Sequence, residues 1–168
     1  MLLCFAWARR GFFVGAERSS RSRKLLSLSG TLLGLVVILR LLLHGGNSDV
    51  SLSILGISTV IVSVLIFYWA MSSYGSVRPG IAFSPGVRGS INTSGPYKFV
   101  RHPFYLSYII YWIGVVLIIP EFLIFCGVVF MISLYYYAAR KEECLILKTN
   151  LSEAYTEYKK NTGMFLPF

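Results

Sequence analysis

The sequence predicts an all-α, multi-pass membrane protein with about four transmembrane helices and an amphipathic C-terminal helix. Of its 168 residues, 55% are apolar and only 14% are charged, whereas about a quarter of the residues in soluble domains are charged. The apolar residues gather in four long runs. Sixteen Lys and Arg against seven Asp and Glu would suit a nucleic-acid partner, but the charges lie between the apolar runs, which favours membrane lipids as the partner.

Two runs in the N-terminal half are long enough to cross a bilayer as helices. Residues 25–43 form the first run, which only Arg40 interrupts, and residues 51–71 form the second, which has no charge. At 1.5 Å per residue the first run reaches about 28 Å, close to the thickness of the hydrocarbon core. Arg40 lies near the end of its run, so we expect it to snorkel outward. Gly30 and Gly34 permit close approach of another helix, within the chain or in a dimer.

The third and fourth runs predict a helical hairpin. Residues 104–119 and 122–137 have 16 residues each, so each helix is about 24 Å long and falls slightly short of a full span. They meet at Pro120 and Glu121. Such a short link predicts two antiparallel helices, whose turn could lie inside the far leaflet.

The C-terminal tail predicts an amphipathic helix at the membrane surface. Apolar and aromatic residues recur there at three- and four-residue spacing, at Cys144, Leu147, Leu151, Tyr155 and Tyr158. Asn150 followed by Glu153 matches a capping box, which predicts that a new helix begins at Asn150.

The basic residues predict the orientation of the chain. They precede the first run, lie between the second and third, and follow the fourth, while the two opposite connections have none. By the positive-inside rule both termini are cytosolic, and residues 1–24 form a basic cytosolic leader. A bacterial inner membrane and an endoplasmic reticulum membrane fit equally well. Three cysteines without paired spacing predict free thiols rather than a disulfide framework or a metal site.

The stretch GPYKFVRHPFYL, residues 95–106, joins the loop to the start of the third run and contains Lys98, Arg101 and His102. Gly95 begins a turn, and Pro103 suits the first position of a helix. Arg101, His102 and Tyr105 then gather at one helix N-terminus, whose free N–H groups suit a carboxylate. The alternative is an interfacial anchor without catalytic duty, which this stretch alone would favour.

An acidic pair, Glu142 and Glu143, follows the fourth run. Because the predicted hairpin returns the chain to the face that it left, we expect these carboxylates to lie near His102. The alternative is a solvated pair on an interfacial helix.

Taken together, TSGPYKFVRHPFY, the hairpin, the acidic pair, LSEAYTEYKK and the final LPF resemble the isoprenylcysteine carboxyl methyltransferase family of integral membrane enzymes. The resemblance covers roughly residues 89–168, whereas the first two helices match only in being apolar. It implies that residues 72–168 form a methyltransferase core preceded by two transmembrane helices in residues 25–71. It also implies S-adenosylmethionine as the cofactor, bound by Tyr97, His102, Pro103, Phe104, Tyr105 and Glu143, with Ser90, Ile91 and Asn92 lining the same pocket.

In this family an Arg four residues before the second Glu is associated with substrate. Ala139 occupies that position here and Arg140 follows it, so we assign substrate positioning to Arg140 as the candidate catalytic role.

The chemistry of the residues suits this cofactor. Arg101 and His102 supply a cationic corner for its carboxylate. Glu142 and Glu143 supply carboxylates, and Tyr97, Phe104 and Tyr105 supply aromatic walls for the sulfonium and adenine. A carboxylate acceptor is already ionised and needs only a cation such as Arg140 or Arg101, whereas an amine or thiol acceptor needs a base such as His102 or Glu142.

We therefore expect a membrane methyltransferase that acts on a carboxylate of a lipid-like acceptor such as prenylcysteine. A phospholipid amine is the alternative acceptor. A non-enzymatic membrane scaffold that binds anionic lipids is the alternative of a different class.

Overall fold

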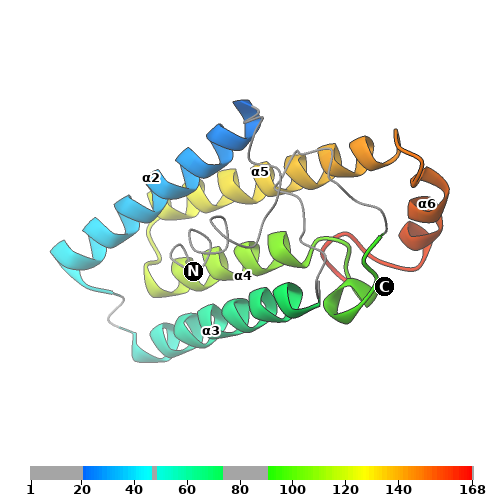
Figure 1. Ribbon diagram of the computed structural model, residues 1–168. Helices are drawn as coiled ribbons and strands as arrows, with labels where there is room; N and C mark the ends of the chain where they lie inside the picture. Colours follow the sequence, from blue (N-terminus) through cyan, green and yellow to red (C-terminus); the bar gives the residue numbers. More distant parts are fainter. Residues whose placement is uncertain (1–20, 47–48, 74–90, 168) are drawn as a thin grey trace.

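The computed structural model describes residues 21–46, 49–73 and 91–167, and it confirms the all-helical class within them. Four long helices lie side by side, and a 3₁₀ turn and a short helix gather at one end of this bundle (Figure 1). In chain order the elements are α2 (Arg21–His44), α3 (Val50–Ser72), η1 (Gly95–Lys98), α4 (Pro103–Ile118), α5 (Phe122–Ile146) and α6 (Ser152–Lys160).

Three of the long helices are long and apolar enough to cross a membrane, namely α2, α3 and α5. The helix α4 is shorter, with 16 residues. The expectation of two equally short hairpin helices was wrong for the second, because α5 continues beyond Tyr137 to Ile146 and has 25 residues. Ala138 and Ala139 are followed by Arg, Lys and Glu, all strong helix formers without Gly or Pro among them, so nothing in the sequence ends the helix at the apolar boundary.

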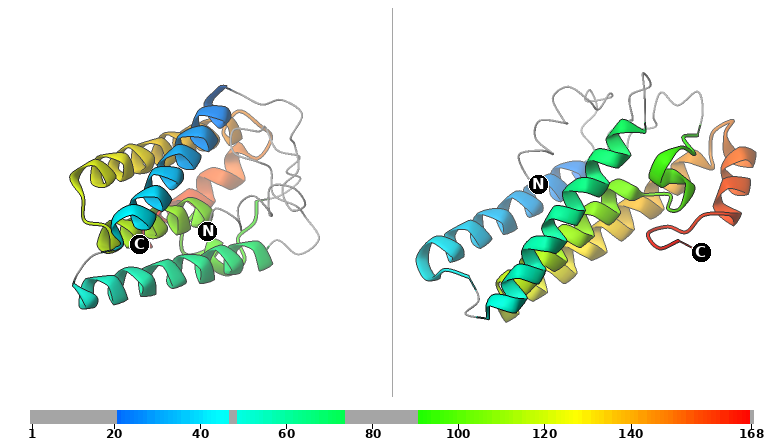
Figure 2. Two further views of the ribbon diagram at one scale, coloured as in Figure 1. Left: turned by 90° about the vertical axis from the view of Figure 1, so that its left-hand side faces the viewer. Right: turned by 90° about the horizontal axis from the view of Figure 1, so that it is seen from below.

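The helices α3 and α4 lie side by side (Figure 2) and pack more extensively than the other pairs of described elements. Glycines permit their close approach. A Cβ atom added to Gly114 would lie 2.8 Å from the Gly56 carbonyl oxygen and 3.2 Å from the Val60 backbone nitrogen. Further along the same face of α3, Ser63 and Phe67 are buried. Small residues at the crossing therefore set the distance between the two backbones.

A second glycine contact joins α2 to α5. A Cβ atom on Gly30 would lie 3.3 Å from the Met131 methyl group, and one on Gly127 would lie 2.7 Å from Leu33. Of the two uses that the sequence left open for Gly30, the structure shows packing within the chain.

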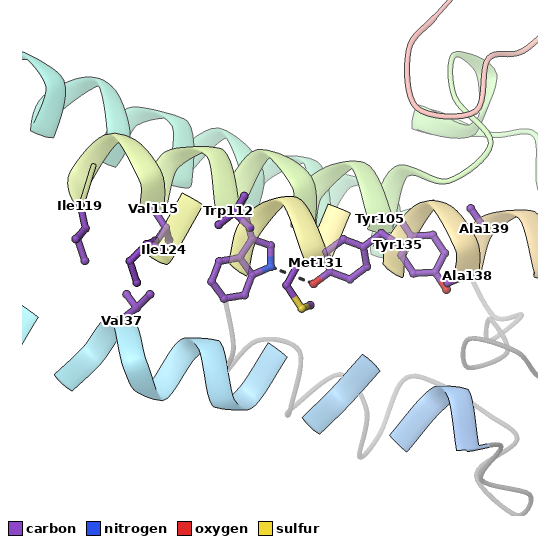
Figure 3. Close-up of a cluster of buried hydrophobic side chains, with 11 residues drawn as sticks. Val37, Tyr105, Trp112, Val115, Ile119, Ile124, Met131, Tyr135, Ala138 and Ala139 are labelled. Carbon is purple, nitrogen blue, oxygen red and sulfur yellow. Dashed lines mark hydrogen bonds between the residues drawn. The ribbon is translucent and has the colours of Figure 1, made fainter. Parts of the chain in front are cut away.

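The core of the bundle fixes the hairpin. Trp112 of α4 is buried against α5, and its indole nitrogen donates a hydrogen bond to the Tyr135 hydroxyl at 3.1 Å (Figure 3). Ile124 and Met131 of α5 are also almost fully buried. The bond satisfies a polar group inside the bundle and holds α5 in register with α4.

Arg40 has a partner that the sequence did not predict. Its Nε donates to the Glu121 carboxylate at the link between α4 and α5, and its Nη1 donates to the Gly45 carbonyl. Arg40 thus ties α2 to the hairpin instead of only reaching outward.

The helical structure of the tail is interrupted near Asn150, as predicted, but the prediction of a capping box there was wrong. The N-cap residue of α6 is Leu151, without a capping side-chain bond. Asn150 lies in the preceding turn, where the Thr149 hydroxyl bonds to the Ile146 carbonyl at 2.7 Å. The structure thus has two helices in the tail region, and the orientation of α6 relative to a membrane stays a prediction.

We expect Gly114→Ala to destabilise the protein by about 1–3 kcal/mol, because the added methyl group would lie 2.8 Å from a backbone oxygen of α3 and would push the two helices apart. Thermal unfolding in detergent would measure the loss. Gly46→Ala is the matched control, since its nearest neighbour would lie at 3.6 Å, an ordinary contact. Equal melting temperatures for the two variants would contradict the tight crossing.

Candidate functional site

The predicted turn is present and is fastened to the end of α3. Gly95 begins η1 with a positive φ of 55°, and a Cβ atom there would lie 1.9 Å from the Ser73 hydroxyl. The Asn92 amide and the Ser94 hydroxyl both donate to the Ser73 carbonyl, at 3.1 and 2.8 Å. Glycine is therefore required here for both its conformation and its size.

The helix α4 begins as predicted, with Pro103 as its first residue and His102 as the N-cap. The His102 side chain makes no capping bond to the helix, so its imidazole is directed to other groups. The N-terminus of α4 leaves its first-turn N–H groups and its positive end at the same place.

The C-terminal segment pairs with the chain just before α4. The Arg101 and His102 amides donate to the carbonyls of Gly163 and Met164, at 2.8 and 3.2 Å. The Tyr158 hydroxyl of α6 donates to the Tyr97 carbonyl at 2.6 Å. Backbone and side-chain bonds together hold the tail against the loop.

Glu143 lies at the centre of a buried ionic cluster. Its side chain is only 2% exposed, and its Oε1 lies 2.8 Å from Nε of Arg101 and 3.4 Å from Nε2 of His102. Its Oε2 lies 3.1 Å from Nζ of Lys159. The Arg101 guanidinium, the Lys159 ammonium and the His102 imidazole surround this carboxylate and favour its ionised form.

Glu142, the residue before Glu143 on α5, also lies near His102. Its Oε1 accepts a hydrogen bond from the Tyr105 hydroxyl at 2.8 Å, and its Oε2 lies 3.7 Å from Nδ1 of His102. The acidic pair therefore faces His102, as the hairpin predicted, and both carboxylates contact residues of α4 or its N-cap.

Among the described residues, two buried polar atoms of the cluster have no hydrogen bond of good geometry, Nε2 of His102 and Oε2 of Glu143. Buried polar atoms in native proteins are almost always hydrogen-bonded, and exceptions often lie at functional sites. The cluster thus has the composition of a binding site for a polar group.

One family model agrees with this arrangement. The isoprenylcysteine carboxyl methyltransferase (ICMT) family matches residues 54–147, more than half of the chain. The chain belongs to the ICMT family. Comparison with curated proteins and with solved structures returns no match. Membership of the ICMT family implies that the protein is a membrane methyltransferase.

The ICMT match differs in extent from the resemblance in the sequence. It begins within α3, which we had matched to the family only by its apolar character, and it ends at Leu147, before α6. Most of the ionic cluster lies inside the matched range, whereas Lys159 lies outside it.

The structure brings five of the predicted site residues together, and these are Arg101, His102, Tyr105, Glu142 and Glu143. Pro103 is buried beside them at the start of α4. Tyr97 is buried in η1.

Four other predicted residues have different surroundings. Asn92 bonds to the end of α3, and the Phe104 ring packs on Phe67 with centroids 5.3 Å apart. Ile91 is half-buried just before the turn, and Arg140 is exposed on α5. Ser90 lies outside the described residues.

Arg101 was expected to offer a cation to a ligand, but its guanidinium is already engaged. Besides the bond to Glu143, its Nη1 donates to the carbonyls of Thr162 and Lys159. Arg101 therefore joins the loop, α5 and the tail. The sequence analysis did not predict Lys159 as a site residue. Charge complementarity between a lysine of the tail and the two glutamates could have indicated it.

We expect Arg101→Gln to destabilise the protein by about 3–5 kcal/mol, because it leaves the buried Glu143 carboxylate without its closest cation. Thermal unfolding would measure this loss, and limited proteolysis would show earlier cleavage of the released tail. Lys160→Gln, which removes an exposed pair with Glu157, should leave both readouts unchanged. A tail equally protected in Arg101→Gln would contradict the joining role.

Proposed function

We propose that the protein is an S-adenosylmethionine-dependent methyltransferase that acts on a carboxylate of a lipid-like acceptor such as prenylcysteine. The observation that carries the proposal is the buried cluster of His102, Glu142 and Glu143 at the N-terminus of α4, inside the range of the ICMT match.

The donor set of the cluster suits the cofactor. The amino-acid end of S-adenosylmethionine carries an ammonium and a carboxylate, and its sulfonium carries a further positive charge. Glu142 and Glu143 offer acceptors to the ammonium, and Oε2 of Glu143 has no well-aligned donor in the part of the chain that the structure describes. The first turn of α4 offers N–H groups and a positive potential to an anionic group. The residues present therefore fit the group.

Aromatic side chains line the cluster on the bundle side. The rings of His102 and Tyr105 lie 5.7 Å apart, and Tyr105 stacks on Tyr135 with centroids 5.8 Å apart. Aromatic faces attract cations through their quadrupole. Tyr105 also donates to Glu142, which orients that carboxylate and leaves the ring fixed.

S-adenosylmethionine, when bound, supplies an electrophilic methyl group on a positively charged sulfur. The tasks of the protein are then to hold the acceptor oxygen in line with the methyl carbon and to exclude water. A carboxylate acceptor is ionised at neutral pH and needs no proton acceptor. Arg140 of α5, which is exposed close to the acidic pair, is our candidate for positioning it.

The position of the cluster supports an acceptor that arrives from the bilayer. Glu142 and Glu143 lie near the C-terminal end of α5, a helix that is long and apolar enough to cross a membrane. A prenyl or acyl chain in the bilayer would thus bring its polar head to the level of the cluster. The charge distribution along the sequence supports the cytosolic face.

One observation favours a second acceptor class. An amine must lose a proton when it is methylated. Nε2 of His102 lies 3.4 Å from Oε1 of Glu143 and has no well-aligned hydrogen bond within the described residues, so it could accept that proton. A phospholipid amine is therefore the second candidate.

We expect purified protein in detergent to bind S-adenosylmethionine saturably, and Glu142→Gln to weaken binding about 10-fold or more, because a charge-assisted hydrogen bond contributes about 1.5–3 kcal/mol. Isothermal titration calorimetry would measure both affinities. Glu142 is the better site for this change because Glu143 also holds Arg101. Cys144→Ser, an exposed neighbour on α5, is the control and should bind as the wild type does. Absence of binding at millimolar cofactor would contradict the proposed function and favour a membrane scaffold.

The acceptor is tested with methyl-labelled cofactor. We expect label in a base-labile ester of farnesylcysteine analogues, because a carboxylate is the acceptor that needs no base. Label in phosphatidylethanolamine that resists base, and that His102→Gln abolishes while cofactor binding persists, would favour the amine acceptor instead.

A further inference from the structure

We infer that Lys159 of α6 binds the carboxylate at the amino-acid end of the cofactor. This inference rests on the proposed function and adds a binding residue to it. Lys159 lies outside the range of the family match and reaches the site from the C-terminal tail.

The site needs a cation that can still accept a ligand, and Arg101 does not meet this requirement. The Arg101 side chain is 6% exposed, and it donates to Glu143 and to two main-chain carbonyls of the tail. Because so little of this side chain is exposed, a ligand's carboxylate has little access to its guanidinium, and its bonds to Glu143 and the tail hold the fold at this point.

Other cations near the tail are also directed elsewhere. Lys160 pairs with Glu157 on the exposed side of α6. Lys141 lies over the Tyr137 ring, 5.9 Å from its centroid. Neither of these two contacts involves Glu142 or Glu143.

Lys159 is partly exposed to solvent and also lies beside the acidic pair. Its side chain is 35% exposed, while its Nζ lies 3.1 Å from the buried Oε2 of Glu143. That carboxylate already has Arg101 as its closer cation, and the contact between Lys159 and Oε2 lacks the geometry of a hydrogen bond. The ammonium of Lys159 can therefore turn to a second anion without leaving Glu143 uncompensated.

The backbone of Lys159 is held in place, so that a ligand has to order only its side chain. Its carbonyl accepts from Nη1 of Arg101 at 3.3 Å. The preceding residue, Tyr158, bonds to the Tyr97 carbonyl, and the Thr162 hydroxyl bonds to the Tyr158 carbonyl at 2.7 Å. The lysine thus projects from a fixed point beside the acidic pair.

The resulting site is complementary to a zwitterion. Arg101 and Lys159 carry two positive charges, and Glu142 and Glu143 carry two negative charges. The ligand's carboxylate would contact Lys159, and its ammonium would contact the glutamates, of which Glu142 is the more exposed. A charge-assisted bond on each end fixes the orientation of the amino-acid group.

The test compares two ligands. Wild-type protein and Lys159→Met are titrated with S-adenosylmethionine and with 5′-methylthioadenosine, which has no amino-acid end. We expect Lys159→Met to weaken S-adenosylmethionine binding by about 10-fold or more and to leave 5′-methylthioadenosine binding within about twofold. Lys159→Arg keeps the charge and should recover most of the lost affinity. Lys160→Met is the matched control and should bind both ligands as the wild type does.

The other outcomes overturn the inference. Unchanged or tighter S-adenosylmethionine binding in Lys159→Met would show that Lys159 is a bystander or competes with the cofactor for Glu143. An equal loss for both ligands would show a structural role for Lys159. Wild-type protein that binds neither ligand would instead contradict the proposed function itself, so the two failures are distinguishable.

Discussion

The buried pair between Arg101 and Glu143 is the interaction on which the arrangement of the site depends. It joins three segments that lie far apart in the sequence, because Arg101 precedes α4, Glu143 lies on α5, and the same guanidinium bonds to carbonyls of the tail. A buried carboxylate without a partner is costly. The positions of the loop, the hairpin and the tail are therefore coupled through the Arg101 side chain. If one of the three segments moves, the guanidinium loses hydrogen bonds to the others.

Packing within the helical bundle fixes the register of α4 and α5, and this register positions Glu143 beside Arg101. The bond from Trp112 to Tyr135 and the pair between Arg40 and Glu121 lie at different levels of the bundle and both restrain the hairpin. One residue of slippage along α5 would move Glu143 by about 1.5 Å and rotate it by about 100°, which would take its carboxylate away from Arg101. Packing far from the site thus decides whether the acidic pair faces His102.

The sequence predicted what local patterns determine. Apolar runs predicted the helices, Pro103 predicted where α4 begins, and the short link predicted that Glu142 and Glu143 return to His102. It did not predict the partners of Arg101, since these include carbonyls of a tail about sixty residues away, and no periodicity encodes such a contact. The length of α5 was missed because hydrophobicity marks where a helix leaves the membrane and does not mark where the helix ends.

A contribution to the stability of the fold does not by itself explain why this cluster is made of charged residues. Apolar side chains of similar volume often hold two elements together as well as a buried ion pair does, or better, and the tail already has backbone bonds to the loop. The cluster nevertheless places four charged side chains and an imidazole beside one helix N-terminus. Two of its buried polar atoms have no well-aligned partner within residues 21–46, 49–73 and 91–167. A polar ligand at this place would supply the hydrogen bonds that these two atoms lack. Its position near the end of an apolar helix would let that ligand meet an acceptor whose hydrocarbon chain stays in the bilayer, which is the requirement that methyl transfer to a lipid imposes.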